Sequence, residues 1–229
     1  MTAGGQTGDT PPSLQDLGRH FGTDKHDASH SFLGESYLDI YDRYMTPYRE
    51  LPVNLLELGV RGGHSLRMWK DYFRQGRIIG VDIKPECVAQ SEDRIEVEIA
   101  SQNDADALKA LSDRVGGFDI ILDDASHINA LSVASFRILF PLLSPGGLYI
   151  IEDLGMSWVD YANHEDDPDF MENTLADNAA IGNSIRQDRA DLETVFREKL
   201  FDMDMRRGDV RLMHFWSQLV VIQKASEQP

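Results

Sequence analysis

The sequence predicts a doubly wound α/β fold, because from residue 54 onward short apolar runs alternate with longer segments of helical periodicity. Each apolar run is bounded by glycine or acidic residues and is apolar throughout rather than at alternate positions. Strands of this kind are buried on both faces, as in a parallel sheet between two layers of helices. The expected strands are 54–59, 78–83, 95–100, 118–124 and 147–153, and the expected helices are 65–73, 104–115 and 128–143.

Two further strands are expected near the end of the chain, after a helix at 192–200. They cover 210–216 and 218–224, which lie too close together in the chain for a crossover helix. Such neighbours pair as an antiparallel hairpin. The hairpin brings the expected sheet to seven strands.

The region before the sheet predicts a helical cap over residues 13–50. Ser13 is a suitable N-cap for a helix that stops at Gly22, and a second amphipathic helix runs from Tyr37 to Met45. Residues 1–12 are rich in Gly, Thr and Pro and are expected to form a disordered tail. The main domain is then expected at 51–225.

Composition limits the classes of partner. With Lys+Arg 22 against Asp+Glu 39, the formal net charge is −17, which repels nucleic acid and anionic membranes. No stretch approaches the roughly 20 apolar residues that span a bilayer. One cysteine, Cys87, cannot form an internal disulfide, and the N-terminus shows no signal-peptide pattern, so a cytoplasmic location is expected.

A glycine-rich turn follows the first strand, where ligands of doubly wound sheets bind. It reads Glu57-Leu58-Gly59-Val60-Arg61-Gly62-Gly63. Arg61 stands where a dinucleotide-binding turn has its second glycine, which favours a nucleoside carrying an amino-acid arm over a pyrophosphate. Asp82 ends the second strand, 25 residues after Glu57, and an acid at that place accepts hydrogen bonds from both ribose hydroxyls.

Acidic residues also end the fourth and fifth strands. Asp124, Glu152 and Asp153 should converge, because adjacent parallel strands end at the same edge of a sheet. Three carboxylates repel one another unless a hard cation balances them, and all-oxygen ligands favour Mg²⁺, with Mn²⁺ or Ca²⁺ as alternatives. The alternative interpretation is that these acids only cap helices: Asp124 or Ser126 would cap the helix near Ile128, and Asp153 would cap the segment after it.

Four segments give the chain a resemblance to a known family. It resembles the class I S-adenosylmethionine-dependent methyltransferases, whose Rossmann-like sheet has seven strands, and within them the sugar O-methyltransferases of antibiotic biosynthesis that act on macrolide- or enediyne-linked deoxysugars. The resemblance extends over roughly 17–224, with Ala125 where members usually carry glycine. The matching segments are His20-Phe21-Gly22-Thr23-Asp24-Lys25, Leu55-Leu56-Glu57-Leu58-Gly59-Val60, Asp123-Asp124-Ala125-Ser126-His127 and Ile151-Glu152-Asp153-Leu154.

The resemblance implies a set of cofactor contacts. Glu57 and Gly59 would contact the methionine arm of S-adenosylmethionine, and Asp82 would hold its ribose. Ser101 and Gln102 would approach the adenine. Three more residues, Thr23, Lys25 and Asp123, are expected to hold or enclose the cofactor. The resemblance also implies a divalent ion on the acids matching Asp124, Glu152 and Asp153.

His127 lies three residues after Asp124, at the mouth of the same crevice. A neutral alcohol is a weak nucleophile whose proton must leave as it accepts a methyl group. An imidazole that titrates near neutrality is a suitable proton acceptor, and a metal on the hydroxyl lowers the hydroxyl pKa. The alternative is a histidine that only binds backbone at a helix start. We expect His127 to be the catalytic base.

The polar segment 155–188 is too long for a connector and contains Trp158, Tyr161 and Phe170, which favours a substrate lid that packs on a sugar. The expected function is therefore metal-assisted methyl transfer to a hydroxyl of a small-molecule glycoside by a homo-oligomer, without nucleic acid or membrane. Two alternatives remain: a catechol-type O-methyltransferase, whose vicinal hydroxyls would use the same acids, and a non-catalytic nucleotide-binding module.

Overall fold

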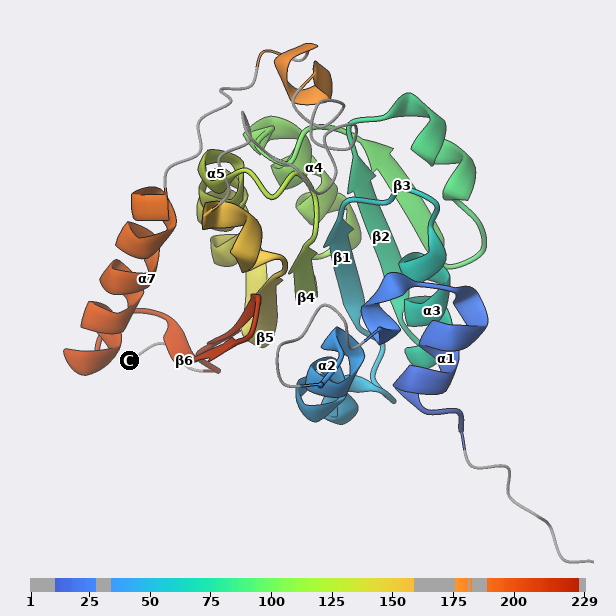
Figure 1. The fold of residues 1–229 in the computed structure, drawn as a ribbon, viewed down its shortest axis with the longest axis horizontal. Coiled ribbons are helices and arrows are strands. Elements are labelled where there is room, and N and C mark those ends of the chain that lie inside the picture. Colours follow the sequence, from blue (N-terminus) through green and yellow to red (C-terminus); the bar gives the residue numbers. More distant parts are fainter. Residues whose placement is uncertain (1–10, 28–33, 159–175, 181, 183–188, 227–229) are drawn as a thin grey trace, which may run out of the picture.

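The described residues fold around a seven-stranded sheet (Figure 1). The computed structural model describes residues 11–27, 34–158, 176–180, 182 and 189–226. The strand order is β3-β2-β1-β4-β5-β7-β6, in which β1 to β5 are parallel and β7 is antiparallel to both β5 and β6. The bounds are β1 (Asn54–Leu58), β2 (Arg77–Asp82), β3 (Ile95–Ile99), β4 (Phe118–Asp123), β5 (Leu143–Ile151), β6 (Val210–Trp216) and β7 (Leu219–Lys224).

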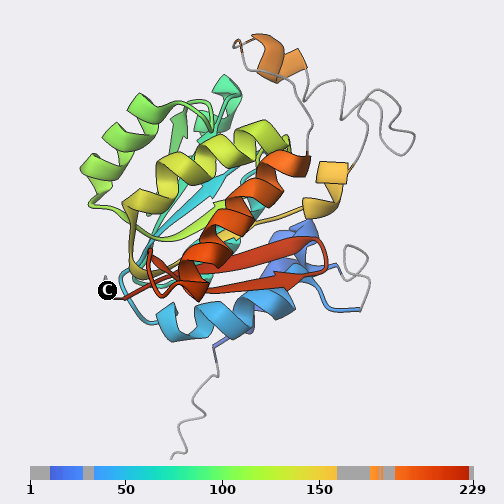
Figure 2. The same cartoon turned by 90° about the vertical axis from the view of Figure 1, so that its left-hand side faces the viewer.

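Helices cover both faces of this sheet (Figures 1 and 2). The helices α1 (Leu14–Phe21), α2 (Tyr37–Met45) and α3 (His64–Tyr72) pack on one face, and α4 (Ala105–Val115), α5 (Asn129–Leu139) and α7 (Arg189–Asp204) pack on the other. Successive strand residues alternate between the two cores: Leu55 faces the first and Leu56 the second. The prediction of a doubly wound sheet with a C-terminal hairpin is confirmed.

The N-terminal helices begin where local hydrogen bonding favours them. Ser13 and Ser36 each cap a helix, and each forms a capping box with the acid three residues later, Asp16 or Asp39. Gly22 ends α1 in the left-handed conformation, at φ 71°. The caps expected at Ser13 and Gly22 are therefore confirmed.

The structure differs from expectation between α5 and β5. The helix expected to reach residue 143 ends at Leu139, and a 3-10 turn (Phe140–Leu142) follows. Pro141 explains the early end, because proline has no N–H to donate within an α-helix. β5 then begins at Leu143, ahead of the expected 147, with a shift in its register against β4 between Phe118 and Ile120.

Most of the expected lid, 155–188, lies outside the described residues. The 3-10 helix η6 (Leu154–Trp158) follows the end of β5 and includes the first residues of this segment. Its last residue, Trp158, is exposed, and the Arg189 guanidinium lies over the indole ring, 4.8 Å from the ring centroid. Residues 1–10 of the expected tail also lie outside the description. Among the described helices, none has the length and apolar character needed to cross a membrane.

Candidate active site

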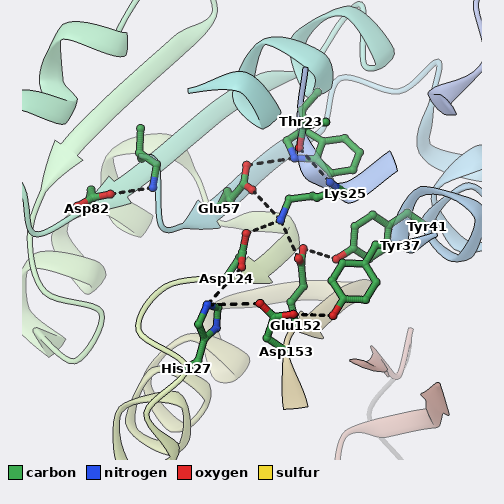
Figure 3. A network of polar contacts seen from close by, with 12 residues as sticks. Thr23, Lys25, Tyr37, Tyr41, Glu57, Asp82, Asp124, His127, Glu152 and Asp153 are labelled. Atoms are coloured by element: carbon green, nitrogen blue, oxygen red, sulfur yellow. Dashed lines mark hydrogen bonds and ion pairs between the residues drawn. The ribbon is translucent and has the colours of Figure 1, made fainter. Parts of the chain in front are cut away.

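The carboxyl ends of β1, β4 and β5 meet at one point of the sheet. The chain passes from β1 to β2 on one side, and β4 lies on the other side of β1, so this is a topological switch point, where ligands of such sheets bind. A small pocket of about 40 Å³ opens here, enough for an ion or a few water molecules. It is lined by Asp24, Lys25, Tyr37, Asp124, Glu152 and Asp153. All of these except Asp24 are labelled in Figure 3.

Gly59 lets the ends of β1 and β4 approach each other. Its φ is 93°, and a Cβ built there would lie 2.2 Å from the carbonyl oxygen of Asp124. Every residue other than glycine would thus overlap with the Asp124 backbone and displace it. The close approach of the two strand ends is therefore sufficient to require glycine at position 59. The expected contact of Gly59 with the cofactor stays a prediction.

The three predicted metal ligands converge in this pocket. Asp124 and Asp153 are partly exposed, whereas Glu152 is buried. Burial and the neighbouring Asp124 hold the pKa of Glu152 well above its usual range. The alternative that Asp124 is a helix cap is wrong, because α5 has no side-chain cap and the Ser126 hydroxyl accepts from the backbone N–H of Ile128.

Lys25 enters the same pocket from the N-terminal cap, on the 3-10 helix η1 (Asp24–His26). Its ammonium group donates to Asp124 Oδ2 and, at 2.7 Å, to Glu152 Oε2, and it lies 3.7 Å from Glu57 Oε1. The lysine is 4% exposed, and the nearby carboxylates outweigh burial to raise its pKa well above the usual value. It is thus a buried cation beside two buried acids, Glu57 and Glu152, and the partly exposed Asp124.

Two tyrosines of α2 hold the acids from the other side (Figure 3). The Tyr37 hydroxyl donates to Asp153 Oδ1 at 2.6 Å, and the Tyr41 hydroxyl donates to Glu152 Oε1. Burial is the first cause that raises the pKa of each phenol, followed by the adjacent carboxylate. The sequence predicted only an amphipathic helix for the segment that contains these tyrosines. Only the folded structure shows that their hydroxyls lie close enough to the acids to donate hydrogen bonds.

His127 faces the same acids. Its Nε2 lies 3.4 Å from Asp153 Oδ2 and 3.9 Å from Asp124 Oδ1, and ligand atoms of these three residues all lie within 4.8 Å of one another. Both His127 and Asp153 have positive φ, 55° and 53°. Non-glycine residues in this conformation are uncommon and cluster at functional sites.

Two other expected cofactor residues are deeply buried acids. Glu57 accepts from the indole N–H of Trp69 at 3.1 Å, and burial raises its pKa to about 7. Asp123 accepts from the Ser135 hydroxyl, and burial raises its pKa to about 6. The carboxylate of Asp123 therefore contacts α5.

The remaining expected cofactor residues surround the ends of β1, β2 and β3. Asp82 accepts from the backbone N–H groups of Val60 and Lys84, at 2.8 and 2.9 Å, so it fixes the glycine-rich turn while keeping acceptor capacity. Ser101 donates to Asn103 Oδ1.

Two further residues of that set are buried. Gln102 bridges Asp123 and the backbone N–H of Ser126. Thr23 caps η1 and accepts from the backbone N–H of Lys25. Their contacts with a cofactor stay predictions.

The chain is similar in sequence to known proteins. Residues 56–154 match the family described as a methyltransferase domain. The chain is 42% identical over 161 residues to mycinamicin VI 2''-O-methyltransferase of Micromonospora griseorubida, covering 67% of this chain and 38% of that protein. It is 40% identical over 154 residues to 8-demethyl-8-alpha-L-rhamnosyl tetracenomycin-C 2'-O-methyltransferase of Streptomyces olivaceus, covering 64% and 39%.

A solved structure extends the likeness over nearly the whole chain. The MycE methyltransferase of the mycinamycin pathway, in complex with Mg and SAH, matches with a TM-score of 0.72 and 32% identity over 95% of this chain and 56% of that one. The part of the chain that matches the two curated relatives above corresponds to about two fifths of their length. Residues 56–154 thus match a methyltransferase domain, and the expected resemblance to the sugar O-methyltransferases of antibiotic biosynthesis is confirmed.

Proposed function

We propose that this chain transfers a methyl group from S-adenosylmethionine to a hydroxyl of a glycosylated natural product, with the help of a divalent metal. The observation that carries the proposal is one pocket in which Asp124, Glu152 and Asp153 meet, with the His127 imidazole 3.4 Å from Asp153. Support also comes from MycE, which was solved with Mg, SAH and mycinamycin VI.

The residues fit a hard cation. Carboxylate oxygens are the ligands that Mg²⁺ prefers. A cation bound between two carboxylates would offset their electrostatic repulsion. Asp124 and Asp153 each keep one oxygen on the side of His127, whereas both oxygens of Glu152 are bonded, to Lys25 and Tyr41. We assign Asp124, Glu152 and Asp153 as the metal ligands. Bound there, Mg²⁺ would lower the pKa of an acceptor hydroxyl.

His127 takes the proton of the acceptor hydroxyl on Nε2. The Asp124 and Asp153 carboxylates face this atom, at 3.9 and 3.4 Å. The Nε2 atom lies at the strand ends beside Asp124 and Asp153, so that proton transfer to it needs no large rearrangement. S-adenosylmethionine, as the methyl donor, supplies a strongly electrophilic methyl group on sulfur.

The cofactor would occupy the ends of β1, β2 and β3. There, Glu57 and Gly59 would contact the methionine arm, and Asp82 the ribose. Thr23, Lys25, Ser101, Gln102 and Asp123 would hold or enclose the remainder. A cap at 13–50 and a substrate lid at 155–188 complete the proposed domain plan. We also propose a homo-oligomeric, cytoplasmic enzyme.

The test is methyl transfer followed by mass spectrometry. Purified protein is incubated with S-adenosylmethionine, Mg²⁺ and an equimolar mixture of a deoxysugar-bearing macrolide and a catechol, with and without excess EDTA. We expect a gain of one methyl group on the glycoside, lost with EDTA. Methylation of the catechol instead would make the chain a catechol-type enzyme, and binding of S-adenosylmethionine without transfer would favour a non-catalytic module.

A further inference from the structure

The structure assigns to Lys25 the role of an internal counter-ion that holds the metal ligands in the metal-free protein and leaves them when the metal binds. The inference rests on the proposed function, because it concerns the same acids. It begins from the position of the ammonium group, which donates to Asp124 Oδ2 and Glu152 Oε2. These are two of the three residues assigned as metal ligands.

Charge explains why a lysine is needed there. Glu57, Asp124, Glu152 and Asp153 gather at three strand ends, and Glu57 and Glu152 are at most 3% exposed. Buried carboxylates without a compensating cation are costly. Lys25 contacts three of these four acids, at 2.7 Å for Glu152 and 3.7 Å for Glu57, so a cation on this chain does what a metal would do.

Geometry explains why the lysine and the metal exclude each other. Both oxygens of Glu152 are engaged, Oε1 by Tyr41 and Oε2 by Lys25. A divalent ion that binds both Asp124 and Glu152 must come within a few ångströms of the ammonium group, and two cations repel each other strongly at that distance in a poorly solvated site. Glu152 becomes a ligand only after Lys25 has moved.

Glu57 provides a destination for the displaced ammonium group. Its Oε1 is fully buried and, among the described residues, accepts no hydrogen bond, although Lys25 Nζ lies only 3.7 Å away. A short movement of Nζ away from Asp124 and Glu152 would convert this contact into a hydrogen bond. The positive charge would then stay inside the site, next to the carboxylate oxygen Oε1 of Glu57.

Lys25→Met tests this inference, because methionine keeps the length of the side chain and removes the charge. Lys109→Met is the matched control, since Lys109 is an exposed lysine of α4 paired with Asp113 and its loss changes the net charge equally. Titration calorimetry measures the Kd for Mg²⁺, and thermal unfolding in EDTA and in Mg²⁺ measures Tm. These readouts do not require turnover.

We expect Lys25→Met to bind Mg²⁺ at least tenfold more tightly than the wild type, and to lose roughly 10 °C of Tm in EDTA but much less in Mg²⁺. Lys109→Met should match the wild type in both. An unchanged or weaker Mg²⁺ affinity in Lys25→Met would overturn the inference. Wild-type protein that binds no Mg²⁺ at all would instead overturn the proposed function, so the two failures are distinguishable.

A second variant covers the case in which Lys25→Met does not fold in EDTA. Lys25→Met combined with Glu57→Gln removes one buried carboxylate together with the lysine and restores the charge balance. Its Kd for Mg²⁺ is compared with that of Glu57→Gln alone. The inference requires tighter binding in the double variant, and equal binding would contradict it.

Discussion

Replacement of Gly59 by alanine tests how the ends of β1 and β4 are held together. The new Cβ would be built 2.2 Å from the Asp124 carbonyl oxygen, at a backbone φ of 93°. The left-handed conformation costs about 1–2 kcal/mol for an L-residue. Overpacking against a backbone atom adds about 1–3 kcal/mol. The expected loss in the free energy of unfolding is therefore about 2–5 kcal/mol.

Gly116→Ala separates these two contributions. Gly116 ends α4 at a similar φ of 88°, but a Cβ there meets no heavy atom within 4 Å. It should lose only the conformational part, about 1–2 kcal/mol. Urea unfolding followed by circular dichroism measures both variants, and calorimetry measures Mg²⁺ binding.

The clash should also weaken the active site. Relief of the overlap requires the strand ends to separate by about 1 Å, a displacement that can reduce turnover ~10²-fold. Gly59→Ala should therefore bind Mg²⁺ more weakly, because Asp124 moves, whereas Gly116→Ala should bind it normally. If the two variants lost equal stability and both kept the wild-type Mg²⁺ affinity, the reasoning about the strand ends would be refuted.

Three other predictions concern the base, a buried acid and a helix cap. His127→Ala should lower kcat by ~10²–10⁴-fold while the Kd for S-adenosylmethionine stays unchanged, and a near-normal kcat would exclude this base. Because burial raises the pKa of Asp123 from 3.8 to about 6, the folded protein binds that proton more tightly than the unfolded chain, so stability falls as pH rises across this window. Between pH 4 and pH 7, the stability of Asp123→Asn should fall by about 2 kcal/mol less than that of the wild type, and an identical pH profile would contradict this. Ser13→Ala should cost about 1 kcal/mol in urea unfolding, because the capping box with Asp16 is lost; no change would mean that α1 does not depend on its cap.

The sequence was a good guide to the sheet, because buried parallel strands leave continuous apolar runs that end abruptly at acids or glycine. β1, β3 and β4 differ from their expected bounds by a single residue at most at each end. The start of β5 was missed because Pro145, Gly146 and Gly147 interrupt the apolar run at the register shift. A strand that contains turn-forming residues cannot be recognised from its sequence alone when pairing with a neighbouring strand is what keeps those residues extended.

The site was predictable where it depends on strand order alone. Asp124, Glu152 and Asp153 could be brought together because β4 and β5 were expected to be neighbours. The ion pair of Lys25 with Glu152 could not, since 127 residues separate them and only the packing of the cap on the sheet joins them. The hydroxyls of Tyr37 and Tyr41 were hidden for the same reason, because an aromatic residue on a buried helix face is usually an apolar contact.

A crystal structure of the protein soaked with Mn²⁺ and S-adenosylhomocysteine would test the central claim most directly, since Mn²⁺ replaces Mg²⁺ and scatters anomalously. We predict an anomalous peak within coordination distance of Asp124, Glu152 and Asp153, adjacent to the His127 ring, with the Lys25 ammonium group moved onto Glu57. A map without a peak among these acids, in a crystal whose cofactor site is filled, would contradict the account.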